Sequence, residues 1–170
     1  MDTASKHFGD QSLSKSPHDE LQALMVDNDR QFLTRTAGVM SACRCFGSME
    51  KCPQFDHPTH PCESEYWAQL GDLIYFAEHA FAAEERLLRP LRDSAFHLTW
   101  EAHVAAHAEF LAELGDFTNE GSGVTVCRHI DQLVTLIEAF FLAHRLEHFQ
   151  RALDALKALE KSPEQSTNRG

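Results

Sequence analysis

The sequence WEAHVAAHAEFLAELGDF at residues 100–117 carries apolar and imidazole side chains at steps of three and four residues. That spacing places them on one face of an α-helix. Residues 17–42, 65–91 and 124–161 repeat the pattern, and no segment alternates as a strand does. Because most connections are short, the four segments predict an all-α protein, an antiparallel up-down-up-down four-helix bundle.

The predicted bundle occupies residues 16–161 and forms a single domain. Ser16 and Pro17 are typical of a helix start, because serine caps the first turn and proline fits its first position. The polar residues 1–15 and the end of the chain, 162–170, are expected to be disordered tails.

Composition excludes several classes of protein. The chain has 170 residues, and its 26 acidic against 15 basic side chains give a formal charge of -11, which repels nucleic acid. No apolar run approaches the roughly 18 residues that span a membrane, and the first residues show no signal peptide. The five cysteines cannot all pair. We therefore expect a cytoplasmic protein with reduced thiols and with no nucleic-acid or membrane partner.

Imidazole and carboxylate side chains occupy the apolar faces of all four predicted helices. His103 and His107 lie four residues apart, about 40° of helix rotation, and His144 and His148 repeat this spacing. A single inward histidine is usually an ordinary core residue, but a set from four helices is costly to bury without a partner. A metal ion such as iron, zinc or manganese would satisfy it. The set is His18, Glu84, His103, His107, His144 and His148.

Three motifs follow one another in the chain: LIYFAEHAFAAEERLL at residues 73–88, HVAAHAEFL at 103–111 and FFLAH at 140–144. With His18 and Leu21, they resemble the hemerythrin family, in particular the bacterial hemerythrins, over residues 17–156. The resemblance implies a four-helix bundle around a non-heme di-iron centre that binds O2 reversibly at one iron. Some members of that family sense oxygen or redox state.

The resemblance also implies a set of ligands. His103, His107 and His144 would form the three-histidine site of one iron, and Glu84 would bridge the two irons. His18 would be one histidine of the second iron. On this assignment the cofactor is iron, with two ions per chain.

Two positions depart from the family pattern. Ala80 stands where the family has a histidine four residues before the bridging glutamate, and Phe149 stands where it has an aspartate. His79 is the neighbour of Ala80, but it lies about 140° around the helix from Glu84. His79 would therefore bind metal only across a local irregularity such as a π-bulge.

His148 and Glu147 are the nearest replacements for the missing ligands on the last helix. We expect His148 to reach the second metal, since it shares the face of His144. Glu147 would replace the missing bridging carboxylate if the helix rotates slightly, and otherwise it would remain in solvent. If neither residue compensates, the second site is empty and the protein is mononuclear or degenerate.

Such a centre favours O2 binding or oxygen or redox sensing over an enzyme, because no residue is an evident anchor for an organic substrate. The ligand would be O2 or another small diatomic molecule, and a sensor would act on a protein signalling partner. One alternative is a di-iron oxidoreductase acting on peroxide or nitric oxide, or an iron donor in repair. Another is a zinc-stabilised bundle that binds partners, its iron site decayed. Apolar side chains that would keep water from the metal are Phe32, Phe81, Phe110, Phe140 and Phe141.

A loop rich in cysteine and histidine is predicted between the first two helices, at residues 43–64. Thiolates and imidazoles at this density favour a second metal such as zinc, or a thiol switch that moves the loop over the metal pocket. A polar loop whose cysteines have no role is the third interpretation. The residues concerned are Cys43, Cys45, Cys52, His57, His60 and Cys62. Cys127, near the start of the fourth helix, is expected to be a core residue.

Overall fold

The computed structural model describes residues 16–43, 61–119 and 126–162. Within these ranges the chain forms helices joined by turns, and no strand. The elements are α1 (Pro17–Ser41), α2 (Pro61–Arg92), α3 (His97–Asn119), α4 (Val126–Ala143), the π-helix η3 (His144–Phe149) and α5 (Gln150–Glu160). The predicted all-α class is confirmed for the described chain. The predicted tail 1–15, the predicted tail 162–170 apart from Ser162, and loop residues 44–60 lie outside it.

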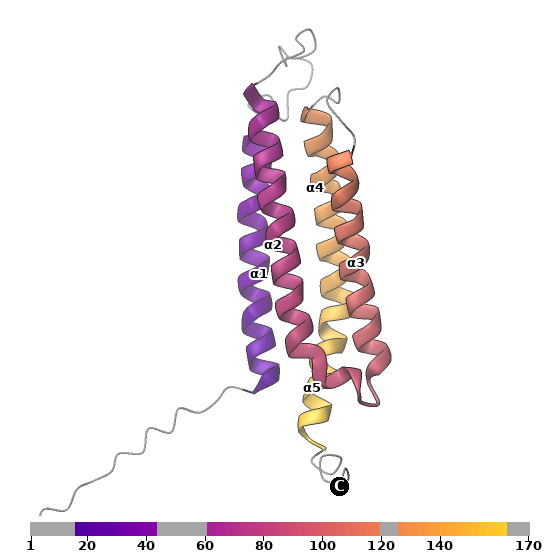
Figure 1. Ribbon diagram of the computed structural model, residues 1–170. Helices are drawn as coiled ribbons and strands as arrows, with labels where there is room; N and C mark the ends of the chain where they lie inside the picture. Colours follow the sequence, from indigo (N-terminus) through magenta and orange to yellow (C-terminus); the bar gives the residue numbers. More distant parts are fainter. Residues whose placement is uncertain (1–15, 44–60, 120–125, 163–170) are drawn as a thin grey trace, which may run out of the picture.

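The long helices lie side by side, an arrangement compatible with a helical bundle (Figure 1). In Figure 1, α4, η3 and α5 follow one another as a single rod beside α3. α2 packs against both α1 and α3. None of the described helices is long and apolar enough to cross a membrane.

The starts of the first two helices follow from local sequence. The hydroxyl of Ser16 accepts a hydrogen bond from the backbone N–H of Asp19 at 3.2 Å, and Pro17 opens α1, as predicted. α2 begins at Pro61, four residues before the predicted start at Glu65. Proline suits the first position of a helix, which needs no N–H donor there. Cys62 therefore lies in α2 and not in the loop to which the sequence analysis assigned it.

The core consists of two apolar clusters. The first includes Phe32, Leu70, Phe81, Phe110, Ile130 and Ile137. The second includes Leu21, Met25, Leu88, Leu91, Leu153 and Leu156. Together they bury the inward faces of the helices, which is the main favourable contribution to folding.

A polar layer separates the two clusters. On α2, Glu84 lies between Phe81 of the first cluster and Leu88 of the second. On α1, Asn28 occupies the corresponding position between Met25 and Phe32. Both polar side chains are buried, so the layer interrupts an otherwise apolar interior and requires partners within it.

Candidate metal centre

Four buried side chains meet in the polar layer: Glu84, His103, His107 and His144. One possible ligand atom from each lies within 4.8 Å of those of the other three. Their residues are only 1–4% exposed. The four side chains come from α2, α3 and η3, and all four belong to the predicted ligand set. A buried glutamate and histidine cluster of this kind can hold a metal ion.

The ligand atoms face one another at short range. The Nε2 atoms of His107 and His144 are 3.0 Å apart, and Glu84 Oε2 lies 3.5 Å from His107 Nε2 and 3.6 Å from His103 Nε2. Lone pairs directed at each other at such distances repel unless a proton or a cation lies between them. Ligands of one ion with bonds of about 2.1 Å lie up to about 4.2 Å apart. These three distances fall within that limit, and the group as a whole spans up to 4.8 Å.

Several polar atoms of the centre have no hydrogen-bond partner within the described chain. They are Glu84 Oε2 and both ring nitrogens of His103, each buried. A buried polar atom without a partner costs about 1–3 kcal/mol. A cation between these atoms would remove that cost for Glu84 Oε2 and for one nitrogen of His103, so the donor set fits a metal ion.

Burial and mutual contact displace the ionisation of the ligands. Burial opposes ionisation of Glu84, but contacts with His103 and His107 outweigh it and lower the pKa of this carboxyl to about 2. Burial, reinforced by the neighbouring imidazoles, lowers the pKa of His144 to about 3. Burial likewise lowers the pKa of His103. An anionic carboxylate beside neutral imidazoles is the protonation state that metal binding requires.

Two further residues orient the ligands. The Nδ1 atom of His107 lies 3.0 Å from Glu85 Oε1, so a proton on Nδ1 leaves the Nε2 lone pair directed at the centre. The amide of Asn28 donates to Glu84 Oε1 at 2.6 Å, which leaves Oε2 facing the histidines. Neither role was predicted from the sequence. Two sequence features could have indicated these roles: Asn28 interrupts the apolar face of α1, and Glu85 directly follows the predicted ligand Glu84.

The π-helix η3 begins at His144. In a π-helix the hydrogen bonds span five residues and one turn takes between four and five residues, so the residues four and five positions after His144 lie on either side of its face. These are His148 and Phe149, both half-buried, and Phe149 packs against the second apolar cluster. The sequence points to a helix irregularity only as the condition for metal binding by His79, whereas the π-helix of the structure begins at His144.

The predicted ligands of a second metal do not join the group of four. His18 is paired with Asp19, with 3.2 Å between Nδ1 and Oδ1, and it lies ten residues before Asn28, about 15 Å along α1. His148 is half-buried, with its ring centroid 6.0 Å from that of His144 and 6.4 Å from that of His103. It adjoins the centre and lines the neighbouring pocket without joining the group of four.

The remaining candidates lie apart from the centre. His79 is exposed, and its Nδ1 lies 2.7 Å from the backbone oxygen of Tyr75. Glu147 is exposed. Cys43 is buried against Cys127 and Cys62 is half-buried in α2, and neither joins a metal-binding group among the described residues. Cys45, Cys52, His57 and His60 lie outside the described residues.

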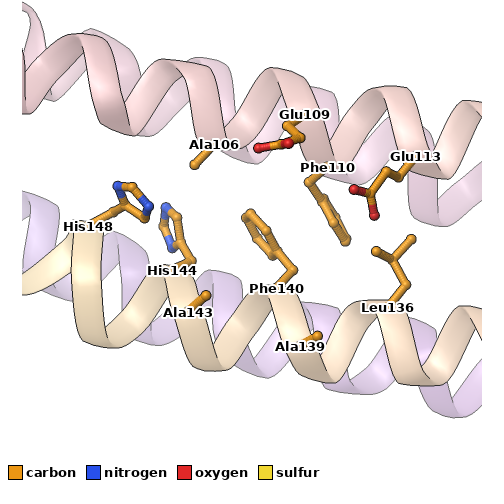
Figure 2. A pocket seen from close by; sticks show the side chains of 10 residues that line it. All are labelled: Ala106, Glu109, Phe110, Glu113, Leu136, Ala139, Phe140, Ala143, His144 and His148. Atoms are coloured by element: carbon orange, nitrogen blue, oxygen red, sulfur yellow. The ribbon is translucent and has the colours of Figure 1, made fainter.

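A pocket of about 230 Å³ between α3 and α4 reaches the edge of the centre. Figure 2 shows His144 and His148 at one end of it, Phe110 and Phe140 across its middle, and the carboxylates of Glu109 and Glu113 along the α3 side. The walls are otherwise small or apolar side chains. The pocket therefore gives a small molecule a route to the neighbourhood of a ligand histidine.

Aromatic rings cover two of the ligands. Phe81 stacks on His107, with ring centroids 3.9 Å apart and planes at 6°, and Phe140 stacks on His144 at 5.0 Å. Both rings were among the phenylalanines expected to form an apolar wall. They hold the imidazoles in place and limit the access of water.

Comparisons with protein families, curated proteins and solved structures gave no match to this chain. The likeness to hemerythrins accordingly stays a prediction from the motifs. The case for a metal centre depends instead on the geometry of the four side chains and on their burial.

Proposed function

We propose that this protein is a non-heme iron protein of the hemerythrin type that binds O2 or senses oxygen or redox state. One ion would be held by Glu84, His103, His107 and His144. The observation that carries the proposal is the burial of these four donors, with the unpartnered Oε2 atom of Glu84 facing His103 and His107. The antiparallel up-down-up-down order of the helices, predicted from the sequence, forms part of the same proposal.

One ion per chain agrees better with the structure than the two implied by the resemblance. Of the ligands expected for a second ion, only the bridging Glu84 belongs to the group, since His18 lies about 15 Å from Asn28 along α1 and His148 lies beside the centre. Asn28, a neutral amide, is the residue of α1 that reaches Glu84. These contacts favour the mononuclear alternative that the sequence analysis left open.

The chain's own residues would prepare the site before any ion arrives. Glu85 fixes the proton of His107 on Nδ1, Asn28 orients the Glu84 carboxylate, and Phe81 and Phe140 hold two imidazoles and exclude water. A ferrous ion at this position would supply electrons and an open coordination position for a small diatomic ligand. The protein would thereby bind the ion and shield it from water.

The pocket beside His144 favours a ligand-binding centre over a purely structural one. A structural zinc site is closed by four protein ligands, and it needs no route for another molecule. Here a pocket of about 230 Å³ leads to a ligand histidine. The same pocket would also admit peroxide or nitric oxide, which keeps the oxidoreductase as the second candidate function.

Metal analysis of anaerobically purified protein tests the proposal. We expect iron, and an optical absorption band that forms with O2 and disappears when O2 is removed. Irreversible oxidation with turnover of peroxide or nitric oxide would support the oxidoreductase instead. Zinc as the sole bound metal, with no response to O2, would contradict the proposal and favour the zinc-stabilised bundle.

A further inference from the structure

Two buried cysteines from distant parts of the chain are in contact. Cys43 follows the end of α1, Cys127 lies in the first turn of α4, and their Sγ atoms are 2.7 Å apart across 84 positions of sequence. The residues are 3% and 1% exposed and belong to the first apolar cluster. Sequence reasoning separated them, assigning Cys43 to a loop site and Cys127 to the core.

This contact is unusually close for two sulfur atoms. A hydrogen bond between the smaller atoms N and O is about 2.9 Å long, and a disulfide is about 2.05 Å. Sulfur also makes weak hydrogen bonds, so a thiol pair gains little by this approach alone. Both cysteines belong to the same apolar cluster as Val39 on α1 and Ile130 on α4. Because a disulfide needs the two Sγ atoms only slightly closer than they already are, a small displacement suffices to join the cysteines.

We propose that Cys43 and Cys127 are a redox pair that a hydroperoxide converts into a disulfide. One thiolate attacks the O–O bond, which gives a sulfenic acid and releases water or an alcohol. The second thiol, as its thiolate, attacks the sulfenic sulfur, the S–S bond forms and water leaves. In total, two thiols lose two electrons and two protons, and the peroxide is reduced by two electrons.

The pair is independent of the proposed metal centre, which contains no cysteine. A bond between Cys43 and Cys127 would tie the end of α1 to the start of α4. These two helices also carry parts of the centre, since Asn28 is on α1 and His144 directly follows α4. Oxidation would thus restrain the helices while leaving all four metal ligands in place.

The test uses the full chain after reduction, which leaves five thiols. The protein is treated with hydrogen peroxide, denatured, alkylated with N-ethylmaleimide and measured by intact mass, then digested. We expect alkylation at three cysteines instead of five and a linked peptide that joins Cys43 to Cys127. Cys62→Ser is the matched control, because Cys62 lies in α2 outside the pair, and it should form the same link.

Cys127→Ser should lose the link and leave Cys43 open to alkylation. A second readout is thermal unfolding: oxidation should raise the midpoint of wild type and of Cys62→Ser, with no rise in Cys127→Ser. The proposal is overturned if peroxide leaves both thiols of the wild type alkylatable. It is equally overturned if Cys43 is linked only to Cys45, Cys52 or Cys62. Because the peptide map of the wild type decides this, misfolding of a variant would not obscure the answer.

Discussion

At the scale of single residues, the centre is defined by what surrounds its ligands. Glu84 could not stay ionised among apolar clusters without compensation, and it receives one hydrogen bond from Asn28 and faces His103 and His107 with its other oxygen. His107 is fixed by Glu85. The orienting residues should therefore affect metal affinity although they are not ligands themselves.

Glu85→Ala should weaken metal binding by about 10–100-fold, because His107 would lose the acceptor that holds its proton on Nδ1. Titration of the metal-free protein with ferrous ion or zinc measures this affinity. Glu78→Ala is the control, since Glu78 is an exposed glutamate on the same helix. Equal affinities in the two variants would show that Glu85 does not orient the ligand.

The metal-free protein should lose stability as the pH falls below about 6.5. The pKa of His144 is lowered from 6.5 to about 3 by burial and by the adjacent imidazoles, so between these values only the unfolded chain binds this proton. Each such proton lowers the free energy of unfolding by about 1.4 kcal/mol per pH unit. Below pH 4.5 the lowered pKa of Glu84 acts in the same direction.

Urea denaturation between pH 7.5 and 5 measures this dependence. His144→Gln should show a shallower slope, whereas His79→Gln, which alters an exposed histidine, should keep the slope of the wild type. A free energy of unfolding that is constant or rises toward acid pH would contradict the interpretation.

At the scale of helices, sequence periodicity predicted the segments and their inward faces but not their irregularities. The motifs placed Glu84, His103, His107 and His144 on inward faces, because steps of three and four residues define such a face. The same step predicted His148 inward, whereas η3 widens the turn and leaves both His148 and Phe149 half-buried. A π segment depends on packing against neighbouring helices, so a local pattern cannot predict it.

Deletion of Leu146, an exposed residue of η3, tests the role of this segment. The deletion would bring Phe149 four positions after His144, the repeat of an ordinary α-helix, so both side chains would keep the same face. We expect the helical content to be retained and the metal affinity to fall, because the turn that presents His144 would change. Circular dichroism and metal titration measure the two effects.

Deletion of Gly71, in the regular helix α2, is the contrast. It would rotate one half of α2 by about 100° relative to the other, so the buried side chains of Leu70 and Leu73 would no longer share the inward face. The deletion should therefore unfold the protein. Unfolding of the Leu146 deletion to the same extent as the Gly71 deletion would contradict the interpretation of η3 as an α-helix with one additional residue.

At the scale of the whole molecule, the polar layer divides the core into two apolar clusters. A metal ion in this layer would link α2, α3 and η3, which carry its ligands. The two apolar clusters lie on either side of the layer, and burial of their side chains favours association of the helices. The sequence could not predict the layer's full membership, because the contact between Asn28 and Glu84 spans 56 positions. Such a contact exists only once α1 and α2 are packed.

Removal of the metal by a chelator should lower the thermal midpoint while leaving most of the helical signal at low temperature. An ion that binds only the folded state stabilises it by RT ln(1 + [L]/Kd), about 2.7 kcal/mol at a hundredfold excess over Kd. Differential scanning calorimetry, with and without chelator, checks this. An unchanged midpoint would show that the ion does not bind the folded centre.

The most direct test of the central claim is the metal stoichiometry of wild type, His107→Ala and His79→Ala, loaded with ferrous ion without oxygen and freed of excess metal. Both substitutions remove an imidazole, but only His107 belongs to the buried group. We predict one ion per chain in the wild type and in His79→Ala, and loss of the ion in His107→Ala. Full occupancy in His107→Ala, or an empty site in His79→Ala, would contradict it.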